Sequence, residues 1–152
     1  MKQLLITAGG TAEKIDQVRS ITNHSTGQLG SLIAEAFLAH GYQVDYLTTH
    51  TALRPVNQDG LALHFIQDTK ELDETLTWLL QQKPYDAVIH SMAVSDFTPA
   101  NSFTLEAFTA RINQQLTKHS APFTKEDVAS LIEQTTAQET ATKISSDTDY
   151  LF

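Results

Sequence analysis

The fold is decided by the stretch KQLLITAGGT at residues 2–11, an apolar run that ends in a pair of glycines. Residues 2–7 have the length and composition of a β-strand. Gly9 and Gly10 permit backbone angles and a close ligand approach that a side chain would forbid. Downstream, Ser25 and Gln28 have the S-x-x-Q spacing of a capping box, which predicts a helix that begins at Ser25. A glycine turn beside a helix N-terminus predicts an anion-binding site.

Strand-like and helix-like segments alternate along the first hundred residues. After the first strand we expect a helix that ends near His40-Gly41, strands at residues 42–48 and 61–66, a helix from Asp68-Thr69, and a buried parallel strand at residues 85–91. This alternation predicts an α/β fold of the Rossmann-like, three-layer type with a mostly parallel sheet. Because such folds bind ligands at the carboxyl ends of the strands, the turn at Gly9-Gly10 and the loop at residues 92–96 are the expected site.

The last third of the chain has a different character. Residues 103–118 and 124–134 are predicted helices joined near Pro122, and the Thr- and Ala-rich residues 135–142 are typical of a connector. The length of 152 residues suits one domain. Since residues 149–152 resemble the opening of a further strand, we expect this domain to be incomplete at its C-terminus.

Composition narrows the classes of partner. The 18 acidic and 10 basic residues give a net charge of −8, so nucleic acid and acidic membranes are not expected to bind. The absence of cysteine excludes disulfides and thiolate metal sites within this chain. The six histidines lack metal-ligand spacing, so no metal site is predicted from protein ligands alone. With no apolar segment of membrane-spanning length and no signal peptide, the expected location is cytoplasmic.

Five short motifs follow one another along the chain: ITAGGT at residues 6–11, VR at 18–19, ITNHSTG at 21–27, AVSDF at 93–97 and KISS at 143–146. In this order they resemble the motifs of the phosphopantothenate-cysteine ligase (phosphopantothenoylcysteine synthetase) family. The resemblance covers the N-terminal two thirds of the chain, to about Phe97, and resumes at Lys143. It implies that residues 1–152 form a single nucleotide-binding ligase domain, with residues 101–142 as a helical insertion or flap.

The resemblance also implies a reaction in coenzyme A biosynthesis. In this family the carboxylate of 4′-phosphopantothenate attacks the α-phosphate of CTP, or of ATP in some members, and pyrophosphate leaves. The amino group of L-cysteine then attacks the resulting acyl nucleotidylate. The implied helper is Mg²⁺. The sequence does not decide whether the protein forms a homodimer.

The family's functional residues carry over onto matching positions. Asn23, Arg19 and Lys143 would act in catalysis, with Lys143 also on the triphosphate. The nucleotide would lie against His90, Ser91, Met92, Ala93 and Asp96, and the intermediate and its phosphates against Gly9, Gly10, Thr11, Ser25, Thr26 and Gly27. Because the family favours a small residue where this chain has Met92, the nucleotide preference stays open.

Simpler roles remain for the same residues. Asn23 and Asp96 are also common turn residues, Ser25 could serve only as a cap, and Arg19 and Lys143 could be solvated surface charges.

Two other functions also stay open. A nicotinamide-dependent reductase would need a G-x-G-x-x-G turn and an acid after the second strand, which residues 8–12 and 47–49 do not supply. The other alternative is a non-catalytic nucleotide-binding fragment.

Overall fold

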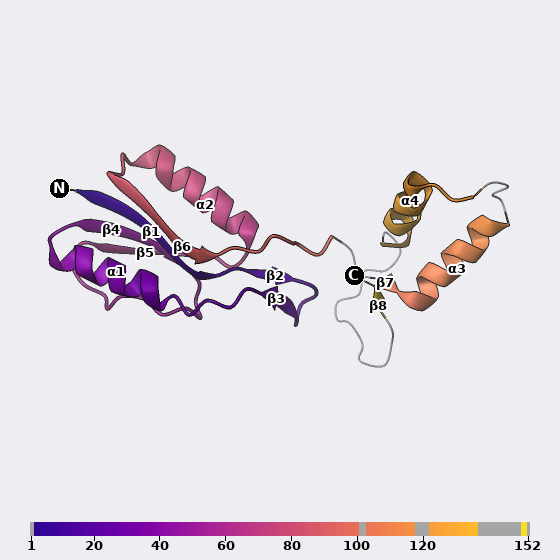
Figure 1. Cartoon of the computed structure of the whole chain (residues 1–152), viewed down its shortest axis with the longest axis horizontal. Helices are drawn as coiled ribbons and strands as arrows, with labels where there is room; N and C mark the ends of the chain where they lie inside the picture. Colours follow the sequence, from indigo (N-terminus) through magenta and orange to yellow (C-terminus); the bar gives the residue numbers. More distant parts are fainter. Residues whose placement is uncertain (1, 101–102, 118–121, 137–149, 152) are drawn as a thin grey trace. The chain divides into compact units, whose positions relative to one another are not determined.

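Figure 1 shows the computed structural model of the chain, which describes residues 2–100, 103–117, 122–136 and 150–151. Two compact units can be distinguished. One comprises Met1–Glu13 and Ile21–Phe97, and the other comprises Lys14–Ser20 and Thr98–Phe152. The first unit holds the main sheet, so it is the unit in which a ligand site at strand ends can be sought.

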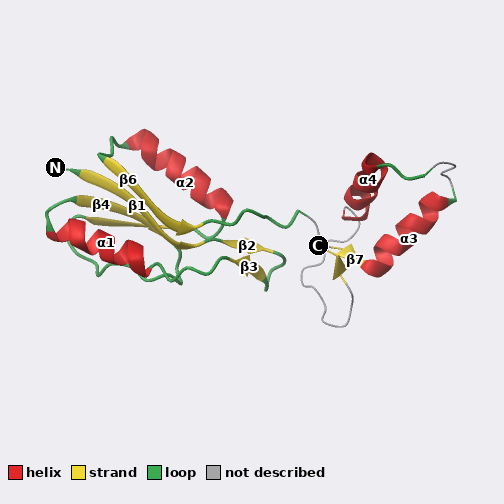
Figure 2. Ribbon diagram, in the orientation of Figure 1, coloured by secondary structure: helices red, strands yellow, loops and turns green. Residues whose placement is uncertain are grey.

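The first unit is built on a four-stranded parallel sheet in the order β5-β4-β1-β6. Its strands are β1 (Gln3–Gly10), β4 (Gln43–Thr48), β5 (Leu61–Phe65) and β6 (Ala87–Ala93). Two helices, α1 (Gln28–Ala39) and α2 (Thr69–Gln82), lie on opposite faces of the sheet, as Figure 2 shows. The expected Rossmann-like, three-layer α/β fold with a parallel sheet is therefore confirmed.

Side-chain alternation along the inner strands supplies a core on each face. On one face Ile6 and Tyr46 pack with Ala34 of α1, in a cluster completed by Leu4, Ala8, Leu38 and Val44. On the other face Leu47 packs with Leu72 of α2, in a cluster completed by Ile66 and Met92. Because each fully buried aliphatic side chain contributes about 1.5–3 kcal/mol, these clusters fix both helices against the sheet.

The predicted start of the first helix was wrong. α1 begins at Gln28, and its N-cap is Gly27, with φ of 75° and no side chain that caps the helix. The preceding residues bond elsewhere, since the Thr26 carbonyl accepts from the Leu53 N–H at 2.8 Å. A Cβ at Gly27 would come within 2.9 Å of the Leu53 carbonyl oxygen, so this close approach requires glycine.

β6 forms as a parallel strand, but the prediction that it is buried was wrong. In the described sheet it lies at an edge and pairs with β1 alone. Val88 is 46% exposed, and Met92 is the one residue of β6 that is buried. The apolar sequence of a strand favours burial, but whether the strand is buried depends on its position in the sheet.

A short hairpin between β1 and α1 was not predicted. It consists of β2 (Ala12–Lys14) and β3 (Ser20–Thr22). In its turn the Asp16 carboxylate accepts hydrogen bonds from the backbone N–H groups of Val18 and Arg19, at 2.7 and 2.6 Å. Three-residue strands are too short to show a clear hydrophobic period, which is why the sequence did not reveal them.

The second unit contains α3 (Leu105–Leu116) and α4 (Lys125–Thr136), which confirms the two expected helices, although α3 is shorter than expected and α4 ends two residues later. Thr104 caps α3 by accepting from the Ala107 N–H at 3.1 Å. β7 (Phe103–Thr104) pairs antiparallel with β8 (Tyr150–Leu151). Most of the expected connector at residues 135–142 lies outside the described residues. Among the described helices none is both long and apolar enough to cross a membrane.

Candidate functional site

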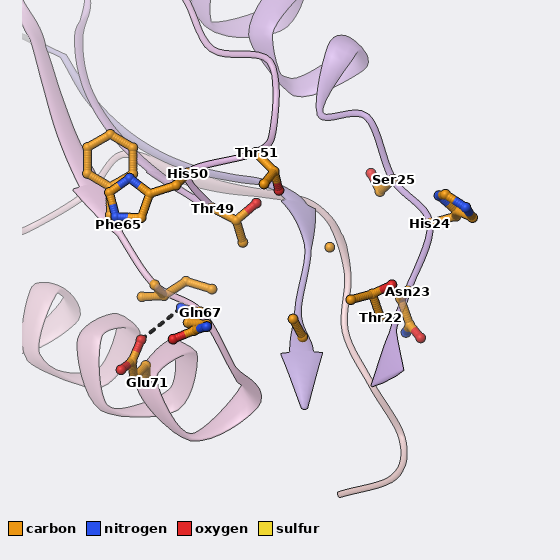
Figure 3. Close-up of a pocket in the computed structure, with 13 residues that line it drawn as sticks. Thr22, Asn23, His24, Ser25, Thr49, His50, Thr51, Phe65, Gln67 and Glu71 are labelled. Carbon is orange, nitrogen blue, oxygen red and sulfur yellow. Dashed lines mark hydrogen bonds between the residues drawn. The ribbon is translucent and has the colours of Figure 1, made fainter. Parts of the chain in front are cut away.

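A cleft of about 630 Å³ lies at the carboxyl ends of β1, β4 and β5, within the first unit. Figure 3 shows it from one side, with segments far apart in the sequence contributing to it. Its lining residues are Gly10, Ala12, Thr22, Asn23, His24, Ser25, Thr49, His50, Thr51, Phe65, Ile66, Gln67 and Glu71. The cleft therefore occupies the end of the sheet where the sequence predicts a ligand.

The glycine turn forms the floor of the cleft and brings two backbones together. Gly9 has φ of 99°, a conformation that side chains disfavour. A Cβ at Gly10 would collide with the backbone carbonyl oxygen of Asn23. The Gly10 position allows the segment at Asn23 to pass directly over the end of β1, while the ligand approach predicted for the glycine pair stays a prediction.

Asn23 is held by its backbone and by its side chain. Its N–H donates to the Thr11 carbonyl oxygen at 3.2 Å, and its Nδ2 donates to the Val94 carbonyl oxygen at 2.7 Å. Thr11 is itself buried and accepts from the Ser95 N–H through Oγ1 at 2.9 Å. The structure therefore brings together three predicted segments, those around Gly10, Asn23 and residues 93–95.

Ser25 lines the cleft, whereas Thr26 and Gly27 do not. Thr26 Oγ1 accepts from the Gln28 N–H at 3.3 Å, and Gly27 is buried at the start of α1. The N-cap is supported from the sheet, since the Tyr46 hydroxyl donates to the carbonyl oxygens of Leu53 at 3.2 Å and of Gly27 at 3.5 Å. Burial raises the pKa of Tyr46 to about 12, with a smaller contribution from Glu35.

Aromatic and polar residues after β4 and at the end of β5 were not predicted as site residues. The rings of His50 and Phe65 stack at 4.3 Å with an interplanar angle of 6°, and the Arg54 guanidinium lies 5.5 Å from the Phe65 ring centre. Thr49 Oγ1 is buried and has no hydrogen-bond partner among the described residues. Single residues from a loop and from the end of a separate strand give no sequence pattern, so only the fold could reveal this wall.

A second wall is formed by the entry to α2. Asp68 caps this helix by accepting from the Glu71 N–H at 2.8 Å, as the sequence suggests for a helix that begins near Asp68-Thr69. The Glu71 carboxylate accepts in turn from the Gln67 N–H at 2.8 Å, which Figure 3 shows as a dashed line. The two carboxylates thus accept from the backbone N–H groups of Glu71 and Gln67 at the start of α2, and Glu71 is the one acidic residue among the cleft-lining residues.

Other predicted residues lie away from the cleft lining. His90 is on β6, with its Nδ1 2.6 Å from Thr7 Oγ1, and Met92 packs in the core beneath α2. Asp96 is exposed in the loop after β6. Arg19 is exposed in the hairpin turn, in the second unit. Lys143 lies outside the described residues.

Few charged side chains line the cleft. Its lining contains His24 and His50 but neither lysine nor arginine. Among the residues described, no group of three or more His, Asp and Glu side chains could hold a metal ion. An anion in this cleft would therefore depend on the backbone N–H groups of the lining segments, unless further residues reach it.

Taken together, the fold and the cleft define the class of Rossmann-like α/β proteins with a ligand cleft at the carboxyl end of a parallel sheet. Within that class the chain belongs to the family described as the DNA/pantothenate metabolism flavoprotein C-terminal domain, whose model matches residues 1–119.

Similar proteins agree with this placement. The coenzyme A biosynthesis bifunctional protein CoaBC of Bacillus subtilis is 40% identical over 105 residues, which make up 67% of this chain and 24% of that protein. The structure of the DNA/pantothenate metabolism flavoprotein from Streptococcus pneumoniae superimposes with a TM-score of 0.74 at 37% identity, covering 99% of this chain and 58% of that one. The C-terminal domain of a CoaBC protein gives a TM-score of 0.57 at 36% identity, covering 65% and 48%. The chain thus spans about a quarter of the length of the curated relatives that it matches.

Proposed function

We propose that this chain carries part of the active site of a phosphopantothenate-cysteine ligase of coenzyme A biosynthesis. The observation that carries the proposal is the position of Asn23, which lines the cleft directly over the glycine turn and is fixed to the loop after β6. Family membership and the similarity to CoaBC proteins support the same reaction.

The proposed reaction has two steps. The carboxylate of 4′-phosphopantothenate attacks the α-phosphate of a nucleoside triphosphate and pyrophosphate leaves. The amino group of L-cysteine then attacks the acyl carbonyl, and the nucleoside monophosphate leaves. Both steps redistribute negative charge over phosphoryl oxygens, so fixed donors near the reacting phosphate lower the barrier.

Residue roles follow from this reaction and remain part of the proposal. Asn23, with Arg19, would face the acyl phosphate, and Gly9, Gly10 and Thr11 would form the surface that the intermediate approaches. Ser25, Thr26 and Gly27 would bind phosphate. The nucleotide would lie along the segment from His90 to Ala93 and against Asp96, with Lys143 on its triphosphate.

The proposed nucleotide is CTP, with ATP as the alternative, and the proposed metal ion is Mg²⁺. Mg²⁺ is usually bound by one or two carboxylates together with substrate phosphates. Glu71 fits that requirement because its carboxylate lines the cleft. When bound, the ion would neutralise charge on the phosphates.

The test measures pyrophosphate release from CTP and from ATP by the protein that carries this sequence, with and without 4′-phosphopantothenate. Release that requires 4′-phosphopantothenate, before any cysteine is added, is expected. Asn23→Ala should lower turnover by about 100-fold, the scale of losing one preorganised donor. Asn57→Ala, at an exposed asparagine that does not line the cleft, is the matched control. Hydride transfer from NADPH without nucleotide-dependent ligation would refute the proposal.

A further inference from the structure

Glu13 is a buried carboxylate that does not line the cleft. It is 3% exposed and follows Ala12, which does line the cleft. Its Oε1 accepts two hydrogen bonds from Thr69, one from the backbone N–H at 2.8 Å and one from Oγ1 at 2.6 Å. A buried carboxylate is costly unless it is well bonded, and here it lies at the N-terminus of α2, where the helix dipole favours negative charge. Glu13 therefore ties the first turn of α2 to β2.

A second set of contacts continues from Thr69 to the loop after β6. Thr69 Oγ1 lies 3.5 Å from Thr11 Oγ1, which accepts from the Ser95 N–H at 2.9 Å. The Thr11 N–H donates to the Ala93 carbonyl oxygen at 3.1 Å, and the Thr11 carbonyl oxygen accepts from the Asn23 N–H at 3.2 Å. Thr11 is thus bonded on different sides to α2, to the loop after β6 and to the segment at Asn23.

These contacts connect two walls of the cleft, the entry to α2 and the segment at Asn23, through the floor of the cleft. The Ala12 N–H donates to the Gln67 carbonyl oxygen at 2.8 Å, which joins the floor to the wall formed by Gln67 and Glu71. The segment at Asn23, which forms another wall of the cleft, bonds to Thr11. The spacing of the walls consequently depends on how residues 11–13 hold the start of α2.

We propose that Glu13 is a positioning residue that sets the spacing of the cleft walls by anchoring the first turn of α2 to residues 11–13. This inference rests on the proposed function for its ligand, the nucleoside triphosphate. Glu13 itself touches no ligand. Without it, the Thr69 N–H and hydroxyl lose their acceptor, and the first turn of α2 can move relative to Asn23.

The experiment compares Glu13→Ala with Asp68→Ala and Glu13→Gln. Asp68→Ala is the matched control because it removes the other side-chain acceptor at the same helix end, on the Glu71 N–H, without touching the contacts of Thr11. Glu13→Gln retains an amide oxygen that can accept from Thr69. All proteins are titrated with CTP and ATP by calorimetry well below their melting temperatures, and exchange of the Ala12, Asn23 and Ser95 amide hydrogens is followed without ligand.

Glu13→Ala is expected to weaken binding of the nucleotide by about 10-fold, the scale of losing hydrogen bonds to a charged group. The same variant should speed amide exchange at Ala12 and Ser95. Asp68→Ala should lower the melting temperature yet weaken binding less than Glu13→Ala and leave these amides unchanged, and Glu13→Gln should restore most of the affinity. A merely structural role would move melting temperature and affinity together in both alanine variants.

Two results overturn the inference: equal effects of Glu13→Ala and Asp68→Ala on affinity, or unchanged amide exchange in Glu13→Ala. If the wild-type protein binds neither CTP nor ATP, the proposed function fails. Amide exchange then still decides the anchoring role of Glu13, because it is measured without ligand.

Discussion

Gly10→Ala is expected to damage stability and ligand binding together. The new methyl group would collide with the backbone carbonyl oxygen of Asn23, and neither atom can escape by a change of rotamer. β1 cannot easily shift either, because Gly10 is paired in register with Ala93 of β6. Overpacking of this kind costs about 1–3 kcal/mol, and contact between two backbones favours the upper end. The corresponding fall in melting temperature is about 10 °C.

Gly41→Ala is the matched control for this prediction. Gly41 also has positive φ, 78°, but a Cβ there would meet no atom within 4 Å. Its cost is limited to backbone strain of about 1–2 kcal/mol, and the cleft stays intact. Thermal melts and calorimetric titration with nucleotide measure both effects. The reasoning would be refuted if Gly10→Ala melted no lower than Gly41→Ala and bound nucleotide like the wild type.

Three further predictions concern charge. Burial disfavours the ionised form of Asp45, but hydrogen bonds from Lys83 at 2.8 Å and His64 at 2.7 Å hold its pKa below 3.8. Its contribution to stability is present above the unfolded pKa and lost as the pH falls through the folded one; Asp45→Asn should remove that acid dependence from denaturant melts. The pKa of Tyr46, raised to about 12, predicts stability that is lost as the pH rises from 10 through that value, and a phenolate absorbance titration without this late step in Tyr46→Phe checks it. Lys143→Gln is expected to weaken triphosphate binding by calorimetry, and unchanged affinity would show that the motif match at residue 143 has no role in this site.

The main sheet could be predicted because its strands carry strong, continuous apolar patterns. β1, β4 and both flanking helices follow from runs in which burial on each face repeats with the period of the element. The burial of β6 could not be predicted, because its sequence says nothing of the strand order that leaves it at an edge. The start of α1 was misplaced for a related reason. The capping-box spacing at Ser25 is local, whereas the bonds that fix Thr26 and Gly27 come from Leu53 and Tyr46.

The glycine floor of the cleft and the segment at Asn23 were predictable from the sequence, while the residues after β4, at the end of β5 and at the entry to α2 were not. His50 comes from the loop after β4 and Phe65 from the end of β5, and their stacking exists only once β4 and β5 lie side by side. Gln67 and Glu71 look like ordinary polar residues at a helix start, and Glu71 does bond there to the Gln67 N–H and to the Asp68 cap. Their second role depends on what the helix start faces, which is set by the packing of α2 on the sheet.

Glu13 shows most clearly what local sequence patterns cannot predict. In the sequence it is a charged residue two positions after a glycine turn and its threonine, and a charged residue in such a place is expected at the surface. In the fold it is buried, because Thr69, 56 positions away, supplies two donors at the end of a helix. Local patterns predict which elements form, since the forces that shape them act over a few residues. The polar contacts that align one element with another join distant residues, and it is these contacts that convert a glycine turn into a cleft of defined width.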